Sequence, residues 1–145
     1  MTVVHHSAIV VHDLDVSLRF WRDGMGFAVL MDSDFDGDWQ TLFAARSNRL
    51  HSVFLGDPGH PHAGIVELVQ FESGAGDAPG AEPPRAGFFL LSCYVDVEAT
   101  LARLSTLGLG GDPRRISVPA PNGAAVQMAT VRDPDGVLVE LIGIP

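Results

Sequence analysis

Two glutamates stand out because each one lies within a short run of apolar residues. Glu67 lies within residues 65–69 and Glu140 within residues 138–142, and valine, leucine and isoleucine fill the rest of both runs. Such runs predict strands. Burying a lone carboxylate costs on the order of several kcal/mol, so it needs a cation or a hydrogen-bond donor. Either glutamate alone could face solvent on a half-exposed strand, but the repetition favours a chemical role.

His6 is the third candidate, and it lies in another apolar run at residues 3–11. Side chains alternate along a strand, so His6 faces the same way as Ala8 and Val10, and His5 is expected to face the other way. A single histidine in a strand is more often structural than functional. An imidazole with two carboxylates, however, suits Zn²⁺, Ni²⁺, Co²⁺, Mn²⁺ or Fe²⁺.

Four other side chains with metal-binding or nucleophilic groups are weaker candidates. His51, His60 and His62 could supply a substitute ligand, although residues 56–64 form a turn that favours solvent exposure for the last two. Cys93 is the only cysteine. Because side chains alternate along a strand, Cys93 should face the same way as Phe89. It therefore either lines a cleft or packs as a small apolar side chain.

The order of elements needed to position these residues occurs twice. The first half predicts strands at residues 3–11, 27–31, 50–55 and 65–71, with a helix at 15–23, an acidic loop at 32–38 and a short helix or strand at 39–45. The second half predicts strands at residues 87–95, 114–118, 124–132 and 137–142, with a helix at 96–107. Both halves therefore read β-α-β-β-β, which predicts an α+β fold.

The domain organisation follows from this repeat. Residues 73–86 are rich in glycine and proline, a composition that excludes a helix or a central strand. We expect a single domain, residues 1–145, with module one at 1–72, a linker at 73–86 and module two at 87–145. Asp13-Leu14-Asp15 in the first module matches Asp96-Val97-Glu98 in the second.

Composition excludes several functional classes. Of the 145 residues, 46% are hydrophobic and 19% charged, which is typical of a chain that forms a core. The net charge of −9 opposes binding to nucleic acid or to an anionic membrane. No apolar run reaches the ~18 residues of a membrane span. The single cysteine and the absence of a recognisable signal peptide predict a cytoplasmic location.

Several motifs together resemble one known family. They are His6–Asp15, Phe20-Trp21, Gly24–Phe27, Ile65–Val69 and the segment Asp133–Leu141, which contains Glu140. In order and spacing they resemble the vicinal oxygen chelate superfamily, which includes glyoxalase I, methylmalonyl-CoA epimerase, extradiol dioxygenases, and fosfomycin and bleomycin resistance proteins. The resemblance implies two βαβββ modules that form a curved mixed sheet around one cleft, with a small-molecule substrate and often a homodimer.

The resemblance also implies a metal site, with one departure. The ligands would come from the first and fourth strands of each module, at His6, Glu67, Phe89 and Glu140. Counting seven residues back from Asp96, as from Asp13 to His6, gives Phe89, which cannot bind a metal and argues against extradiol dioxygenase chemistry. We expect a lyase or isomerase that uses a divalent ion to stabilise an enediolate or similar oxyanion, with Glu67 or Glu140 as the base. The alternative is a metal-free protein that sequesters a drug or metabolite.

Overall fold

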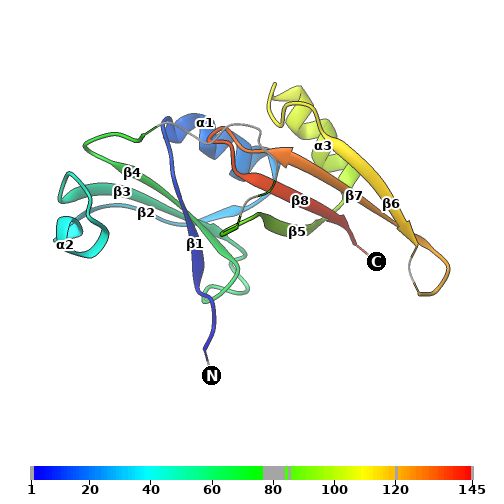
Figure 1. Ribbon diagram of the computed structural model, residues 1–145, viewed down its shortest axis with the longest axis horizontal. Helices are drawn as coiled ribbons and strands as arrows, with labels where there is room; N and C mark the ends of the chain where they lie inside the picture. The colour runs from blue at the N-terminus through cyan, green and yellow to red at the C-terminus, as the bar shows by residue number, and fades with distance from the viewer. Residues whose placement is uncertain (1, 77–83, 85, 120, 145) are drawn as a thin grey trace. The chain divides into compact units, whose positions relative to one another are not determined.

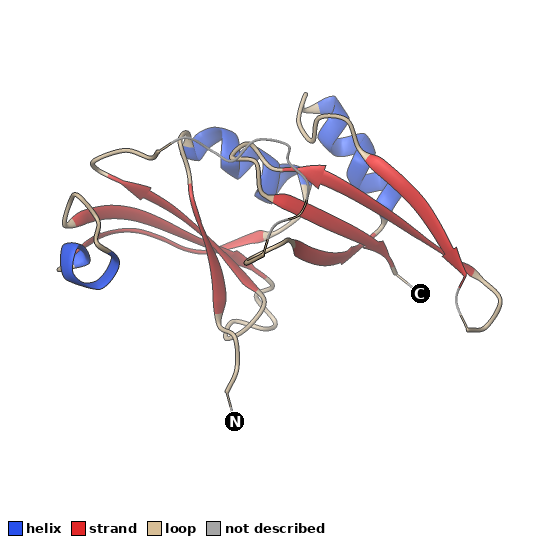
Figure 2. Ribbon diagram, in the orientation of Figure 1, coloured by secondary structure: helices blue, strands red, loops and turns tan. Residues whose placement is uncertain are grey.

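Each half of the chain folds into a four-stranded mixed sheet with a helical segment packed against one face (Figures 1 and 2). The computed structural model describes residues 2–76, 84, 86–119 and 121–144. The chain divides into two compact units, Met1–Asp77 and Ala78–Pro145. The α+β class and the two similar modules predicted from the sequence are confirmed. The predicted linker, residues 73–86, falls partly outside the described residues.

The first module has the sheet order β1-β4-β3-β2, in which only β1 and β4 run parallel. Its elements are β1 (His6–Val10), α1 (Leu14–Leu18), the π-helical segment η1 (Arg19–Gly24), β2 (Ala28–Asp36), α2 (Trp39–Phe43), β3 (Arg49–Gly56) and β4 (Ile65–Phe71). The second module repeats this arrangement with the order β5-β8-β7-β6. Its elements are β5 (Leu91–Val95), α3 (Val97–Thr106), β6 (Arg114–Pro119), β7 (Ala125–Arg132) and β8 (Leu138–Gly143).

The repeated acidic motif caps the first helix of each module. Asp13 accepts a hydrogen bond from the backbone N–H of Val16 at 3.2 Å, and Asp96 accepts one from that of Ala99 at 3.0 Å. A side-chain oxygen at this position satisfies an N–H group that has no partner within the helix. The same local chemistry therefore starts both helices, directly after the first strand of each module.

The core of each module lies between the helical segment and one face of the sheet. In the first module, Phe20 and Trp21 are fully buried together with Leu68 of β4. In the second, Leu104 of α3 is 1% exposed and Leu141 of β8 is fully buried. Because side chains alternate along a strand, the residues before Leu68 and Leu141 face the other side of their sheets. Those residues are Glu67 and Glu140.

Two predicted elements differ from the structure, and a third, which the sequence left ambiguous, is decided by it. The predicted acidic loop at residues 32–38 is wrong for most of its length, because β2 continues to Asp36 and pairs with β3 along residues 49–56. The ambiguous segment at residues 39–45 is the short helix α2. The predicted strand at residues 87–95 begins only at Leu91. Among the described residues, no helix is long and apolar enough to cross a membrane.

Candidate metal centre

His6 and Glu67 meet on the sheet of the first module. The parallel strands β1 and β4 pair Ala8 with Glu67, and His6 lies two residues before Ala8, so it faces the same side of the sheet. The Nε2 atom of His6 lies 3.4 Å from Oε1 of Glu67. The Glu67 side chain is 17% exposed and that of His6 is 37% exposed. A partly buried carboxylate thus faces an imidazole nitrogen at the edge of the sheet.

Ser52 on β3 holds the other oxygen of the same carboxylate. Its hydroxyl donates a hydrogen bond to Oε2 of Glu67 at 2.6 Å, and Ser52 itself is only 1% exposed. Phe54, which pairs with Glu67 across β3 and β4, places its ring 5.3 Å from that of His6. Both oxygens of Glu67 are therefore fixed, Oε2 by a donor and Oε1 beside His6.

The spacing of these two side chains fits a shared metal ion. Metal–nitrogen and metal–oxygen bonds are each roughly 2.0–2.2 Å, so two ligand atoms 3.4 Å apart can bind the same ion. An imidazole and a carboxylate also suit the divalent ions expected from the sequence. Within the described part of the chain, no group of three or more histidine, cysteine, aspartate or glutamate side chains could hold a metal ion. His6 and Glu67 thus form a pair of candidate ligands.

Glu140 occupies the matching position in the second module. It pairs with Ser92 on β5 and with Thr130 on β7, and it lies between the fully buried Val139 and Leu141 on β8. The Ser92 hydroxyl donates a hydrogen bond to Oε1 of Glu140 at 2.8 Å. Each glutamate is therefore held by a serine from a neighbouring strand. That Glu140 joins His6 and Glu67 at one ion remains a prediction.

The strand register corrects the assignment of the missing ligand. Ala8 lies opposite Glu67, and Ser92 lies opposite Glu140, so the counterpart of His6 is two residues before Ser92. By this count the residue is Leu90, which directly precedes β5, rather than Phe89. Counting seven residues back from Asp96 gives the wrong residue, because the segment between the first strand and the helix cap is one residue shorter in the second module than in the first. Neither leucine nor phenylalanine can bind a metal, so the second module still supplies no counterpart to the imidazole of His6.

One predicted side-chain orientation, that of His5, is corrected, and the alternative left open for Cys93 is decided. His5 precedes β1, and instead of facing away its Nδ1 lies 2.9 Å from Nδ1 of His6. Cys93 pairs with Leu141, which faces the helix, so it belongs to that side of the sheet rather than to the Glu140 side. Burial raises the pKa of the Cys93 thiol because the thiolate is poorly solvated there. Cys93 thus packs as a small apolar side chain.

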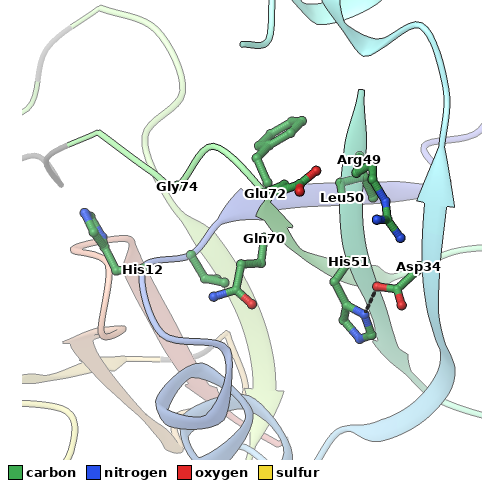
Figure 3. Close-up of a pocket in the computed structure, with 10 residues that line it drawn as sticks. His12, Asp34, Arg49, Leu50, His51, Gln70, Glu72 and Gly74 are labelled. Carbon is green, nitrogen blue, oxygen red and sulfur yellow. Dashed lines mark hydrogen bonds and ion pairs between the residues drawn. The ribbon is translucent and has the colours of Figure 1, made fainter. Parts of the chain in front are cut away.

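The remaining histidines lie outside the candidate site. His60 is exposed and contacts Asp57, and His62 is exposed in the same turn. His51 lies on β3 with the opposite parity to Ser52, beside a hollow of about 420 Å³ on the helix-facing side (Figure 3). Hydrogen bonds from its ring to Asp34 and then Asp32 raise the pKa of His51, against an opposing effect of burial. None of the three supplies a ligand beside Glu67.

Sequence reasoning missed Ser52, Ser92 and the turned ring of His5. The two serines are recognisable only from strand register, because serine is common on any strand surface. The turn between β3 and β4 is too long to set that register by its own geometry. For His5, the relevant signal is its place just outside the strand, where the alternation of side chains no longer applies.

Comparisons with known proteins agree with this fold and with the resemblance seen in the sequence. A family model described as the Glyoxalase/Bleomycin resistance protein/Dioxygenase superfamily matches residues 3–141, and the chain belongs to this superfamily. It is similar to the lactoylglutathione lyase-like protein terB of Aspergillus terreus. The two are 37% identical over 149 residues, which cover 98% of this chain and 75% of the relative.

Solved structures show the same architecture at lower identity. A glyoxalase family protein from Bacillus cereus matches with a TM-score of 0.74 and 18% identity, covering 99% of this chain and 94% of the other. The trypanothione-dependent glyoxalase I of Leishmania major matches with a TM-score of 0.62 and 22% identity, covering 99% and 87%. At these identities the likeness establishes the fold and leaves the chemistry to be argued from the site.

Proposed function

We propose that the protein is a metal-dependent lyase or isomerase of the glyoxalase type that acts on a small oxygenated metabolite. The observation that carries the proposal is the 3.4 Å approach of His6 Nε2 to Glu67 Oε1. It occurs on the first and fourth strands of a module, where the family resemblance implies metal ligands. The lone cysteine fits a reducing compartment such as the cytoplasm.

The proposed ligands are His6, Glu67 and Glu140. When bound, a divalent ion would supply Lewis acidity that favours negative charge on the oxygens of the substrate. Ser52 keeps one oxygen of Glu67 engaged, so the carboxylate presents the other toward His6. Ser92 orients Glu140 in the same way. Three protein ligands leave positions for substrate, as is usual in catalytic sites.

One of the two glutamates also moves the proton. In an isomerisation, its carboxylate removes a proton from the carbon beside a carbonyl and returns it to the neighbouring carbon, so no oxidant or reductant is consumed. The printed name of the fungal relative makes lactoylglutathione the first compound to test. It would form from the hemithioacetal of methylglyoxal and glutathione by such a proton shift.

The experiment compares the metal content of purified protein with its activity. Wild-type protein, loaded in turn with Zn²⁺, Ni²⁺, Co²⁺, Mn²⁺ and Fe²⁺ and then desalted, should retain about one ion per chain by elemental analysis. Glu67→Gln and Glu140→Gln should each lower retention and activity at least about tenfold, because each removes an anionic ligand. The matched control is Glu72→Gln, which removes an exposed carboxylate just beyond β4. Wild-type protein that retains no ion would overturn the proposal.

The register position of Leu90 favours one alternative function. With an aliphatic side chain in place of a fourth ligand, the fold could serve as a metal-free binding protein that sequesters a drug or metabolite. In that case wild-type protein would bind a small molecule equally well before and after chelator treatment. Glu67→Gln would then change affinity for a cationic ligand without any change in metal content.

A further inference from the structure

The face of the second sheet that bears Glu140 has two rows of side chains that cross all four strands. Residues that pair between neighbouring strands lie side by side on the same face of a sheet. The pairing of β6, β7, β8 and β5 places in one row Arg114, Thr130, Glu140 and Ser92. The next row consists of Ile116, Met128, Ile142 and Tyr94. A polar row that contains a proposed metal ligand therefore lies beside an apolar row.

The apolar row is open to solvent. Tyr94 is 72% exposed and Ile116 is 61% exposed. Met128 and Ile142 lie between them, and each is partly exposed. The two rows are two residues apart on every strand, which is about 7 Å. A ligand on this face can therefore contact apolar side chains while it reaches Glu140.

The fold itself does not require these apolar side chains. The first module has the same strand order, and when its rows are counted from Glu67, Ser52 corresponds to Met128 and Ser33 to Ile116. A contiguous apolar patch that a protein leaves exposed commonly marks a binding site. The apolar row is thus specific to the second module and lies outside its core.

Arg114 is an unpaired cation at one end of the polar row. Its neighbour Arg115 faces the helix side of the sheet, next to the buried Ala129, and forms an ion pair with Glu98. No described residue forms an ion pair or a side-chain hydrogen bond with the guanidinium of Arg114. The carboxylate in its own row, that of Glu140, is two strands away, a backbone distance of about 10 Å. A guanidinium without a partner can bind a ligand carboxylate through two parallel hydrogen bonds.

We propose that this face binds an aromatic carboxylic acid, with the carboxylate at Arg114 and the ring over Ile116 and Met128. A flat ring covers neighbouring side chains on a sheet, and the thioether of Met128 and the ring of Tyr94 both make favourable contacts with aromatic groups. A link of one or two carbons between the ring and the carboxylate matches rows that are about 7 Å apart. That this acid is the substrate rests on the function proposed above, in which Glu140 of the polar row binds the metal ion.

Three probes separate the ring from the charge. 2-Naphthylacetate has both, 2-naphthylacetamide has the ring without the charge, and propionate has the charge without the ring. Each is titrated into the whole chain after chelator treatment, and ¹H–¹⁵N NMR measures its affinity and shows which strands it contacts. Because the protein then contains no metal, the result is independent of the proposed metal site.

Each variant has a control that makes the same chemical change elsewhere. Arg114→Gln removes the proposed cation, and Arg115→Gln removes the same charge from the opposite face of the same strand. Ile116→Ser removes an exposed side chain from the apolar row. Its control, Leu42→Ser, removes one that is 66% exposed on α2 of the first module.

We expect wild-type protein to bind 2-naphthylacetate more tightly than the amide by about two- to fivefold, the contribution of an exposed ion pair. Propionate should bind at least about tenfold more weakly, because it lacks the ring. The shifts should be centred on β6 and β7. Arg114→Gln should lower the affinity for the acid to that for the amide, and Ile116→Ser should weaken both naphthyl probes about threefold. Arg115→Gln and Leu42→Ser should match wild type.

Several results would overturn the inference. They are wild-type protein that binds no 2-naphthylacetate or binds the acid and the amide equally, equal losses in Arg114→Gln and Arg115→Gln, and shifts centred on the first sheet. Failure of the proposed function has a different signature. If wild-type protein retains no metal ion, that function fails, but the titrations still decide whether this face binds an aromatic acid.

Discussion

In the first module, the strand beside Glu67 places His6 next to the carboxylate, whereas in the second module the same count along the paired strand gives Leu90, the residue before β5 begins. The side of each sheet that faces the helix is much more alike. Val66 and Leu68 flank Glu67 just as Val139 and Leu141 flank Glu140, and all four are buried. The two modules thus share a packed face and differ on the face that bears the glutamates.

This difference indicates what each face must satisfy. A helix-facing residue has to fit a closely packed core, so similar residues recur. On the other face both modules have a glutamate at the same position, but the hydrogen-bond donor to that glutamate comes from a different strand in each module. Glu67 receives its hydrogen bond from Ser52 on β3, and Glu140 receives one from Ser92 on β5. The two modules therefore hold the same carboxylate through serine hydroxyls on different strands.

The largest expected effect comes from removing these two donors in turn. Ser52→Ala should lower the local stability of the first sheet by about 1–3 kcal/mol, because it leaves a partly buried carboxylate oxygen without a donor. Ser92→Ala should cost the second sheet less than about 1 kcal/mol, because Ser92 is exposed and water can replace the hydroxyl. Amide hydrogen exchange along β4 and β8 measures each sheet separately. Equal losses in the two sheets would contradict the difference in burial.

A smaller effect tests the register that equates His6 with Leu90. Leu90→His should introduce a fourth ligand and strengthen metal binding about tenfold, or about 1.4 kcal/mol. Phe89→His is the matched control, since it adds the same imidazole one residue away, on the position given by counting back from Asp96. Zn²⁺ competition measures both variants. A gain in Phe89→His alone would show that the count, and not the sheet pairing, identifies the counterpart of His6.

Local signals in the sequence predicted much of this structure. The two helices were predicted to begin at residues 15 and 96, and they begin at Leu14 and Val97, because a capping aspartate acts only within one helical turn. The strands that contain Glu67 and Glu140 were predicted from their apolar neighbours. The resemblance to a known family was confirmed by the match over residues 3–141.

Features set by pairing between distant segments were not predictable in this way. The acidic residues 32–36 resemble a loop by composition, but they continue β2 and pair with β3, where His51 contacts both Asp32 and Asp34. The counterpart of His6 depends on a one-residue difference between the modules that only the strand register reveals. Both errors arise where the partner lies many residues away in the chain.

The contact between Asp34 and His51 provides the finest comparison of the two modules. Asp34 pairs with His51 across β2 and β3, and their side chains form a hydrogen bond of 2.7 Å. At the corresponding place on β6 and β7, Ser117 pairs with Gln127, and their side chains form a hydrogen bond of 3.3 Å. The first pair contains a titratable ring between acidic groups, and the second contains no titratable group. Only the first module should therefore show a pH dependence from this position.

The sign of that dependence follows from the raised pKa of His51, caused first by its hydrogen bond to Asp34. A raised folded-state pKa stabilises the fold below the ordinary histidine value of about 6.5, and this contribution disappears as pH rises through the folded value. The contribution is at most about 1 kcal/mol, since Asp34 is largely exposed. In urea unfolding followed by tryptophan fluorescence, the stability of wild type relative to His51→Gln should fall as the pH rises above about 6.5 and through the raised folded-state pKa of His51. Asp34→Asn should reduce this slope, and Ser117→Ala, the matched change in the second module, should leave it intact. A slope that persists unchanged in Asp34→Asn would show that the pH dependence arises elsewhere.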